Sequence, residues 1–228
     1  MKAFSVQETD ECTGAIVFAN SNIEARKWGA HEYNDGELGG LSCRRVPWAD
    51  RYQDKGIPAR EMIAHGWWFE CGQCGHTINE DWLCDNHLPI DGVIGTQHSN
   101  VFCGKRCAKR FYSLERRRKA QERIAIDELK TVVRKRFGDV EFDDTPARFH
   151  GHHARVVSSE HGWIRSYVFV DFKFPGMKIG PASCRVDVDH VGWCRFGPPK
   201  IEYLCCSGDR EAFEAWARSI PMPAQGDA

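Results

Sequence analysis

Four cysteines arranged as two close pairs constrain the fold of this chain more than any other feature of its sequence. Cys71 and Cys74 are separated by two residues, and Cys103 and Cys107 by three. Such short spacing places two thiols on a single turn of backbone, where both can bind the same metal ion. Two such pairs supply four soft ligands, which is the set that a closed tetrahedral Zn²⁺ site requires. The sequence therefore predicts a structural zinc site with these four cysteines as its ligands.

The total number of cysteines also favours a metal over disulfides. The chain has 228 residues, enough to bury a core without covalent cross-links, and its eleven cysteines are an odd number. No N-terminal stretch has the basic start and apolar run of a secretion signal, and no segment approaches the ~18 apolar residues of a membrane span. We therefore expect a soluble cytoplasmic protein, in which close cysteine pairs hold metal more often than each other.

The segment between the two cysteine pairs leaves other ligand sets open. Its 28 residues contain Cys84 and His87, a further pair at metal-ligand spacing. A site made by the first cysteine pair with Cys84 and His87 is one alternative, and a second metal ion is another. Taken alone, Cys84 is expected to be buried as a small apolar side chain, as free cysteines usually are.

The second cysteine pair lies in "VFCGKRCAKRFY", where an aromatic residue precedes the first cysteine and another follows four residues after the second. Phe102, Cys103, Gly104, Cys107 and Phe111 form this pattern. The stretch resembles the second half of treble-clef zinc fingers of the MYM and TRASH group, and "CGQC" resembles the zinc knuckle that opens such a finger. The resemblance covers about forty of the 228 residues. It implies zinc ligation, a treble-clef fold, and a role in binding nucleic acid or protein.

A strongly basic segment begins within the second pair. Residues 105–136 contain thirteen lysines and arginines against four acidic residues, a net charge of +9, so the rest of the −1 chain carries −10. No Gly or Pro interrupts residues 105–137, which predicts one continuous helix of about 50 Å at 1.5 Å per residue. Between residues 115 and 123 only Ala120 is apolar. We therefore expect the middle of this helix to be exposed and to connect two bodies.

An exposed basic helix beside a zinc module favours an anionic partner, and nucleic acid or a nucleoprotein is the first candidate. The residues assigned to this contact are Lys105, Arg106, Lys109, Arg110, Arg116, Arg117, Arg118 and Lys119. The alternative is a helix surface whose charges are merely solvated. A second candidate function is inhibition of a host nucleic-acid-binding effector, in the manner of anti-CRISPR proteins, with the acidic part of the chain imitating DNA or RNA.

A group of histidines raises a third candidate function, that of a metal-dependent nuclease. The group comprises His150, His152 and His153, with His161, Asp143 and Asp144 nearby. Imidazole ligands around an open coordination position would suit phosphodiester hydrolysis. Their spacing matches no hydrolase motif, so the chain is predicted to be a binding protein rather than an enzyme.

The remaining segments predict an α+β protein. A strand at 15–19, a helix after residues 20–22 and a short strand at 41–47 come before the cysteines, where Trp67, Trp68 and Phe69 are expected to form the core of the finger. After the basic helix come β-rich runs with alternation and a closing amphipathic helix, whose apolar spacing predicts packing on an antiparallel sheet. The expected regions are an N-terminal strand–helix region, a zinc finger, a basic connecting helix, a C-terminal α+β domain and a tail, at residues 1–66, 67–112, 113–137, 138–220 and 221–228.

Three stretches, "AIVFANSNIEARKWGA", "SCRRVPWAD" and "HGWWFECGQCG", resemble an arrangement found in small proteins of tailed bacteriophages and prophages. No biochemical activity can be attached to that group. The resemblance implies a bacterial host cytoplasm and an accessory role, such as control of DNA or suppression of a host defence system. The other cysteines, Cys184 among them, are expected to lie in packed cores as small apolar side chains.

Overall fold

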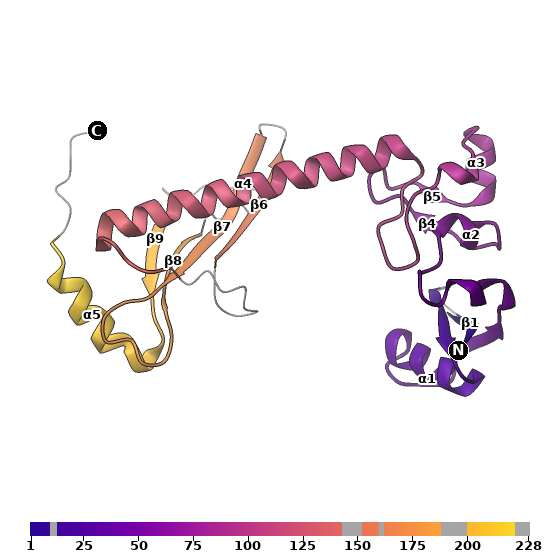
Figure 1. Cartoon of the computed structure of the whole chain (residues 1–228), viewed down its shortest axis with the longest axis horizontal. Coiled ribbons are helices and arrows are strands. Elements are labelled where there is room, and N and C mark those ends of the chain that lie inside the picture. The colour runs from indigo at the N-terminus through magenta and orange to yellow at the C-terminus, as the bar shows by residue number, and fades with distance from the viewer. Residues whose placement is uncertain (10–12, 143–151, 160–161, 188–199, 222–228) are drawn as a thin grey trace. The chain divides into compact units, whose positions relative to one another are not determined.

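The computed structural model describes residues 1–9, 13–142, 152–159, 162–187 and 200–221 (Figure 1). The chain divides into two compact units, Met1–Ser113 and Leu114–Ala228. Both units combine helices with antiparallel sheet, which confirms the predicted mixture of α and β structure. The division between the units falls inside one long helix. None of the described helices has the length and apolar character that crossing a membrane requires.

Unit 1 begins with a three-stranded antiparallel sheet of order β2-β1-β3. Its strands are β1 (Lys2–Glu8), β2 (Gly14–Ala19) and β3 (Leu41–Arg45). The outer two strands match the predicted ones, but the central strand β1 was not predicted. Only Ala3, Phe4 and Val6 of its seven residues are buried, so its apolar pattern is weak, and the segment forms a strand by pairing with β2 and β3 on its two sides.

Helix α1 (Asn22–Tyr33) packs closely on this sheet because the residues facing it are small. Ala25 and Ala30 are buried, and a Cβ added at Gly29 would lie 2.3 Å from Cγ1 of Val6. At the start of the helix, the hydroxyl of Ser21 accepts a hydrogen bond from the backbone N–H of Glu24 at 3.3 Å. This is the capping arrangement that the asparagine- and serine-rich start of the helix predicts.

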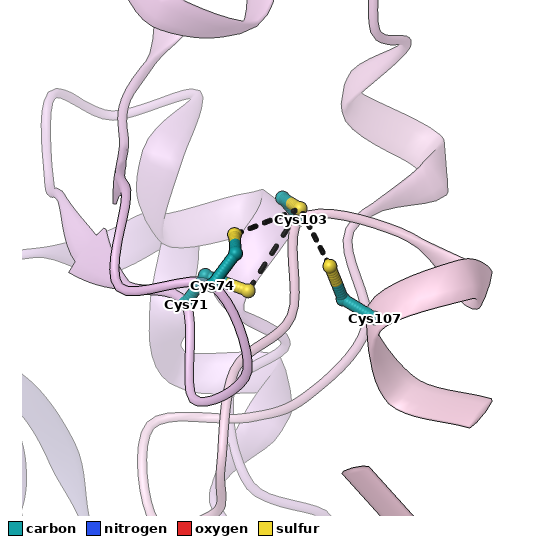
Figure 2. Close-up of side chains that lie close together, drawn as sticks. All are labelled: Cys71, Cys74, Cys103 and Cys107. Atoms are coloured by element: carbon teal, nitrogen blue, oxygen red, sulfur yellow. Dashed lines mark hydrogen bonds between the residues drawn. The ribbon is translucent and has the colours of Figure 1, made fainter. Parts of the chain in front are cut away.

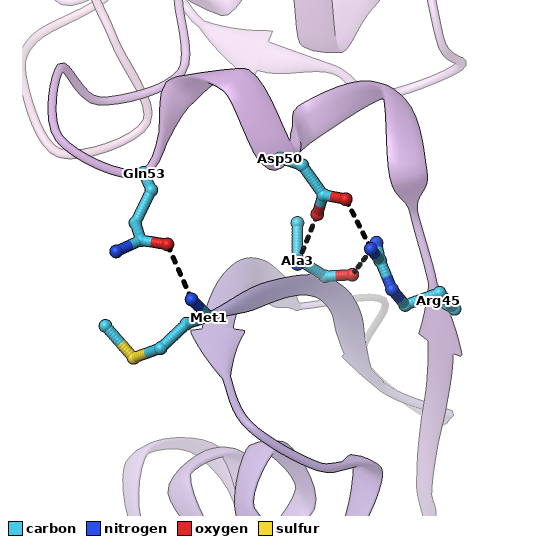
Figure 3. Close-up of polar contacts among 5 residues, drawn as sticks. All are labelled: Met1, Ala3, Arg45, Asp50 and Gln53. Carbon is cyan, nitrogen blue, oxygen red and sulfur yellow. Dashed lines mark hydrogen bonds and ion pairs between the residues drawn. The ribbon is translucent and has the colours of Figure 1, made fainter.

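A short carboxylate network attaches the 3-10 helix η1 (Pro47–Tyr52) to the first strand (Figure 3). Asp50 accepts a hydrogen bond from the backbone N–H of Ala3 at 2.8 Å and forms an ion pair with Arg45. The hydrogen bond from Arg45 holds the pKa of the Asp50 carboxyl below its ordinary value. The N-terminal amine donates to the side-chain oxygen of Gln53 at 2.8 Å, so the middle of η1 and the residue that follows it are both attached to the start of the chain.

Short elements complete unit 1 and carry the cysteine pairs. They are α2 (Ala59–Ile63), β4 (Phe69–Glu70), β5 (Thr77–Ile78), α3 (Glu80–Asp85) and η2 (Ile90–Gly92). Gln97 ties this part to the sheet, since its amide donates to the Ile16 carbonyl at 2.8 Å and accepts from the Ile16 N–H at 3.1 Å. Phe69 packs on the core beneath the cysteines, as predicted. Trp67 packs instead on the core that contains Ile16, and Trp68 is 54% exposed, so the predicted role of these two residues in the core of the finger is wrong.

Helix α4 (Lys105–Phe137) is continuous over 33 residues, as predicted. No residue from Lys109 to Ile124 is buried, which confirms the expected exposure of its middle. Burial resumes at Ala125 and continues on one face with Leu129, Val133 and Phe137. These residues belong to the core of unit 2.

Unit 2 contains a four-stranded antiparallel sheet of order β6-β7-β8-β9. Its strands are β6 (His153–Ser159), β7 (Gly162–Phe172), β8 (Ala182–Asp187) and β9 (Lys200–Leu204). The apolar face of α4 and the closing helix α5 (Arg210–Ser219) pack on this sheet. Phe137 is central to the core, with its ring stacked on those of Phe172 and Trp216 at centroid distances of 5.4 and 4.9 Å. Phe213 is buried and Trp216 packs beside it, which confirms the predicted packing of the last helix.

A buried carboxylate precedes α5. Asp209, at the end of η3 (Ser207–Asp209), accepts hydrogen bonds from the backbone N–H groups of Lys178, Ile179 and Gly180 at 3.1, 2.8 and 3.2 Å. These hydrogen bonds, the one from Ile179 above all, lower the pKa of Asp209. The carboxylate therefore fixes the loop before β8 to the start of α5, a role that the sequence did not reveal.

Candidate metal centre

The first cysteine pair lies on the turn between strands β4 and β5. Phe69 pairs with Ile78, which brings the two ends of the turn together. Within the turn, the Cys71 N–H donates to the His76 carbonyl and the Gly75 N–H donates to the Cys71 carbonyl, both at 2.9 Å. Gly75 has φ of +72°, a left-handed conformation that glycine adopts without a Cβ penalty. The turn therefore directs both thiols of the pair to one side.

The second pair lies where a short bridge meets the start of α4. Phe102 and Ile94 exchange two backbone hydrogen bonds, at 2.8 and 3.0 Å, immediately before Cys103. Cys107 is the third residue of the helix, in its first turn. The Gly72 N–H donates to the Val101 carbonyl at 2.9 Å, so one hydrogen bond also joins the turn of the first pair to the approach of the second.

The four thiols converge, as Figure 2 shows. Cys103 Sγ lies 3.8 Å from Cys71 Sγ, 3.9 Å from Cys74 Sγ and 3.5 Å from Cys107 Sγ. All four sulfurs lie within 4.8 Å of one another. Disulfide-bonded sulfurs would be about 2.0 Å apart, so these cysteines are free. The predicted ligand residues therefore lie together in space, and they can hold a metal ion.

The thiols differ in acidity because their surroundings differ. Burial raises the pKa of Cys71, but backbone N–H groups of Cys103, Cys74 and Gln73 outweigh burial and bring that pKa to about 6. Burial and the neighbouring thiols raise the pKa of Cys103, and burial also raises that of Cys107. Cys71 is the most deeply buried of the four cysteines.

The apolar core beneath the cluster is small. It centres on Phe102, which is fully buried and contacts the rings of Phe111 and Tyr112 at centroid distances of 5.1 and 5.6 Å. Its other buried members are Ala59, Ile63, Cys71, Ile78, Leu83, Val93, Val101 and Ala108. With strands of two residues and helices of five or six, this region gains little from regular hydrogen bonding.

The alternative ligands of the intervening segment do not join the cluster. Among the described residues, the four cysteines are the one group of His, Cys, Asp and Glu side chains that meets the geometry of a metal site. Cys84 is exposed on α3, so the expectation that it is a buried apolar residue is wrong. His87 follows the same helix with φ of +54°, and it lies outside the cluster.

The basic residues assigned to nucleic acid all lie on α4, and seven of the eight are exposed. The exception is Arg118, which forms ion pairs with Glu115 at 2.9 Å and Glu122 at 2.7 Å. Its charge is therefore matched within the helix. Four of the exposed residues, Lys105, Arg106, Lys109 and Arg110, precede the division between the units, and Arg116, Arg117 and Lys119 follow it.

The predicted histidine group is only partly within the described residues, since His150, His161, Asp143 and Asp144 lie outside them. Nδ1 of His152 accepts a hydrogen bond from the backbone N–H of Asp171 at 3.3 Å. The ring of His153 is stacked on Tyr167 and Phe169 of β7. Neither histidine belongs to a metal-binding group formed by residues that the structure describes.

Comparison with known proteins adds no relative: no family model, no curated protein and no solved structure matches this chain.

Proposed function

We propose that the protein is a zinc-containing accessory protein of the bacteriophage type that binds nucleic acid or a nucleoprotein through the exposed basic residues of α4. The observation that carries the zinc part is the convergence of four thiols from two distant turns within 4.8 Å. The proposed site of action is the bacterial host cytoplasm, where reduced thiols bind metal.

Zinc is the metal that this ligand set fits best. Four sulfurs around a tetrahedral Zn²⁺ with bonds of about 2.3 Å lie about 3.8 Å apart. The observed separations from Cys103 are 3.8, 3.9 and 3.5 Å, so a zinc ion fits with little movement of the side chains. Four thiolates leave no coordination position for water, so the metal would stabilise the fold and carry out no chemistry. A turn with two cysteines facing the first turn of a helix is also the arrangement of a treble-clef finger.

Nucleic acid is the partner that the charge pattern favours. A metal held by the four cysteines would fix the start of α4, and the exposed cations follow on this helix, with Ala108 as the one buried residue between Lys105 and Lys119. Lysine and arginine side chains held at fixed spacing neutralise backbone phosphates and release their counterions. Binding of this kind is largely independent of sequence and weakens steeply with salt.

The test uses the full chain prepared under reducing conditions. Elemental analysis is expected to find stoichiometric zinc, and fluorescence anisotropy with a labelled oligonucleotide is expected to show binding that weakens as salt rises. Reversing the charges of Arg116, Arg117 and Lys119 together is expected to weaken binding more than about tenfold at low salt. A metal-free sample would contradict the zinc proposal. If the protein does not bind nucleic acid at low salt and a host protein is retained during purification, the proposed nucleic-acid binding is wrong and the inhibitor function replaces it.

A further inference from the structure

A basic groove lies within unit 2, between the middle of α4 and β6, the edge strand of its sheet. Its volume is about 810 Å³, and it is open to solvent. The side chains used in the argument below are Arg116, Lys119, Arg123 and Ile126 from the helix and His153 and Arg155 from the strand. Arg123 and Arg155 were not predicted from the sequence, because the groove brings together two segments about thirty residues apart.

The side chains that line the groove carry a net positive charge. Glu122 lines it too, but this carboxylate is paired with Arg118. The other cations of the groove, Arg116, Lys119, Arg123 and Arg155, form no ion pair or hydrogen bond through their side chains within the described ranges. Like charges held along one groove repel each other, so an anion bound there lowers the free energy of the protein.

The spacing of these cations fits a chain of phosphates better than a single anion. Arg116, Lys119 and Arg123 occupy positions i, i+3 and i+7, which share one face of a helix and span about 10 Å along its axis. Arg155 adds a cation from the opposite wall. A small anion would contact only part of this row, whereas a nucleic-acid strand presents a phosphate at each nucleotide along it.

An aromatic surface adjoins the row of cations. The exposed ring of His153 lies nearly parallel to those of Tyr167 and Phe169, with interplanar angles of 19° and 26° and centroid distances of 5.2 and 5.8 Å. Unpaired bases stack on such flat rings, and proteins that bind single strands combine a basic groove with stacking side chains. Bases in a duplex are stacked on each other and offer no face to such a ring.

We infer that this groove binds one strand of nucleic acid, with its phosphates along Arg116, Lys119, Arg123 and Arg155 and a base against His153. The inference rests on the proposed nucleic-acid binding and places it in unit 2, between helix and sheet, rather than on the helix alone. It also implies that single-stranded nucleic acid binds more tightly than a duplex of the same length.

The experiment compares neighbouring arginines of α4. Arg116 lines the groove, whereas Arg117 is also exposed but does not line it. Anisotropy of a labelled single strand of about 12 nucleotides, within the usual site size, is measured with the zinc-loaded full chain. Arg116→Glu and Arg155→Glu are each expected to weaken binding about tenfold, and Arg117→Glu less than about threefold. Arg155→Lys keeps the charge and is expected to restore most of the affinity.

His153→Ala tests the stacking contact. It is expected to weaken single-strand binding about tenfold without changing the salt dependence, because it removes a ring and no charge from phosphate contact. All the substituted side chains are exposed, and an unchanged thermal midpoint and zinc content show that each variant is folded.

The outcomes separate this inference from the function on which it rests. One outcome is that the protein binds the strand while Arg116→Glu and Arg117→Glu weaken binding equally and Arg155→Glu has no effect. In that case the assignment of binding to the groove is wrong, and the helix alone binds the strand. If a duplex binds as tightly as the single strand and His153→Ala changes nothing, the preference for one strand is wrong. If the unaltered protein binds neither, the proposed function itself fails.

Discussion

Units 1 and 2 build their interiors in different ways. The part of unit 1 that carries the cysteines has a small apolar core, elements of two to six residues and four thiols within 4.8 Å of one another. Unit 2 has a larger core in which Phe137, Phe172, Phe213 and Trp216 contact each other beneath a four-stranded sheet. If the cysteines hold the proposed metal, unit 1 overcomes the loss of conformational entropy partly by metal ligation, whereas unit 2 does so by apolar burial.

The difference follows from how much apolar surface each segment can bury. In unit 2, aromatic side chains from α4, β7 and α5 cover one another, and burial of their apolar surface alone contributes a large favourable free energy of folding. Around the cysteines, buried side chains come from short segments, with strands of two residues and helices of five or six. The proposed metal, bound to four ligands, would supply there the stabilising free energy that a small core cannot.

The largest expected effect is loss of a cysteine ligand. Cys103→Ser removes the sulfur that lies closest to the other three, and zinc binding contributes about 10–16 kcal/mol in comparable finger peptides. We expect the variant to lose its zinc and the fold of residues 67–112. Elemental analysis and amide hydrogen exchange measure both effects. The matched control is Cys84→Ser, which alters an exposed cysteine outside the cluster and should retain the metal.

Removal of the metal by a chelator tests whether the two units depend on it differently. Amide exchange is expected to accelerate around the two cysteine pairs and to remain slow in β7 and β8, whose stability comes from apolar burial. Equal acceleration in both units would show that the metal stabilises the whole chain, and the contrast between the units would be lost.

The next largest effect is expected from truncation of Phe137, the central aromatic residue of unit 2. Phe137→Ala leaves a cavity beside Phe172 and Trp216 and is expected to destabilise unit 2 by about 3–5 kcal/mol. Urea unfolding followed by exchange of β7 amides measures the change. Ile124→Ala, on the same helix but at a side chain that is 44% exposed, should change stability by less than about 0.5 kcal/mol. Loss of zinc from Phe137→Ala would contradict the independence of the two interiors.

A pH-dependent contribution is expected from Asp209 in unit 2. Because hydrogen bonds from Ile179 and its neighbours lower its pKa in the folded state, the ionised carboxylate stabilises the fold. That contribution is present above the unfolded-state pKa of about 3.9 and is lost as pH falls through the lower folded-state pKa. Asp209→Asn should unfold at lower urea concentration than the parent at pH 7. The difference in unfolding urea concentration between the parent and the variant should decrease on acidification. A difference that does not change with pH would show that the ionised carboxylate does not stabilise the fold.

The smallest expected effect concerns the start of α1 in unit 1. Ser21→Ala removes the hydroxyl that accepts from the Glu24 N–H and should cost about 1 kcal/mol. Ser21→Asp provides another capping oxygen and should recover most of the loss. Thermal unfolding of the zinc-loaded protein measures the difference. A loss as large as that of Phe137→Ala would show that unit 1 depends on local helix stability more than on its metal.

Features that depend on a few neighbouring residues could be predicted from the sequence. The short spacing of Cys71 and Cys74 indicated a shared turn, and the absence of Gly and Pro after Lys105 indicated a continuous helix. The apolar spacing of Phe213 and Trp216 placed α5 on a sheet. Strand β1 was missed because its few apolar residues acquire strand structure only from partners on both sides. Trp68 and Cys84 were assigned to cores from residue type alone, and their exposure depends on how the surrounding turns pack.

Spacing along the chain was enough to predict the turn at each cysteine pair, the basic helix and the mixture of helix and antiparallel sheet, because such spacing controls local backbone geometry. The approach of the two pairs to each other depends on the fold, in which the Gly72 N–H donates to the Val101 carbonyl. Which charges remain without an ion-pair partner could not be predicted from the sequence and depends on the fold. Arg118 is paired with two glutamates, whereas Arg116 and Arg155, distant in sequence, line the same groove. The physical reason is that electrostatic interactions act through distance in space, and the packing of α4 beside β6 determines that distance.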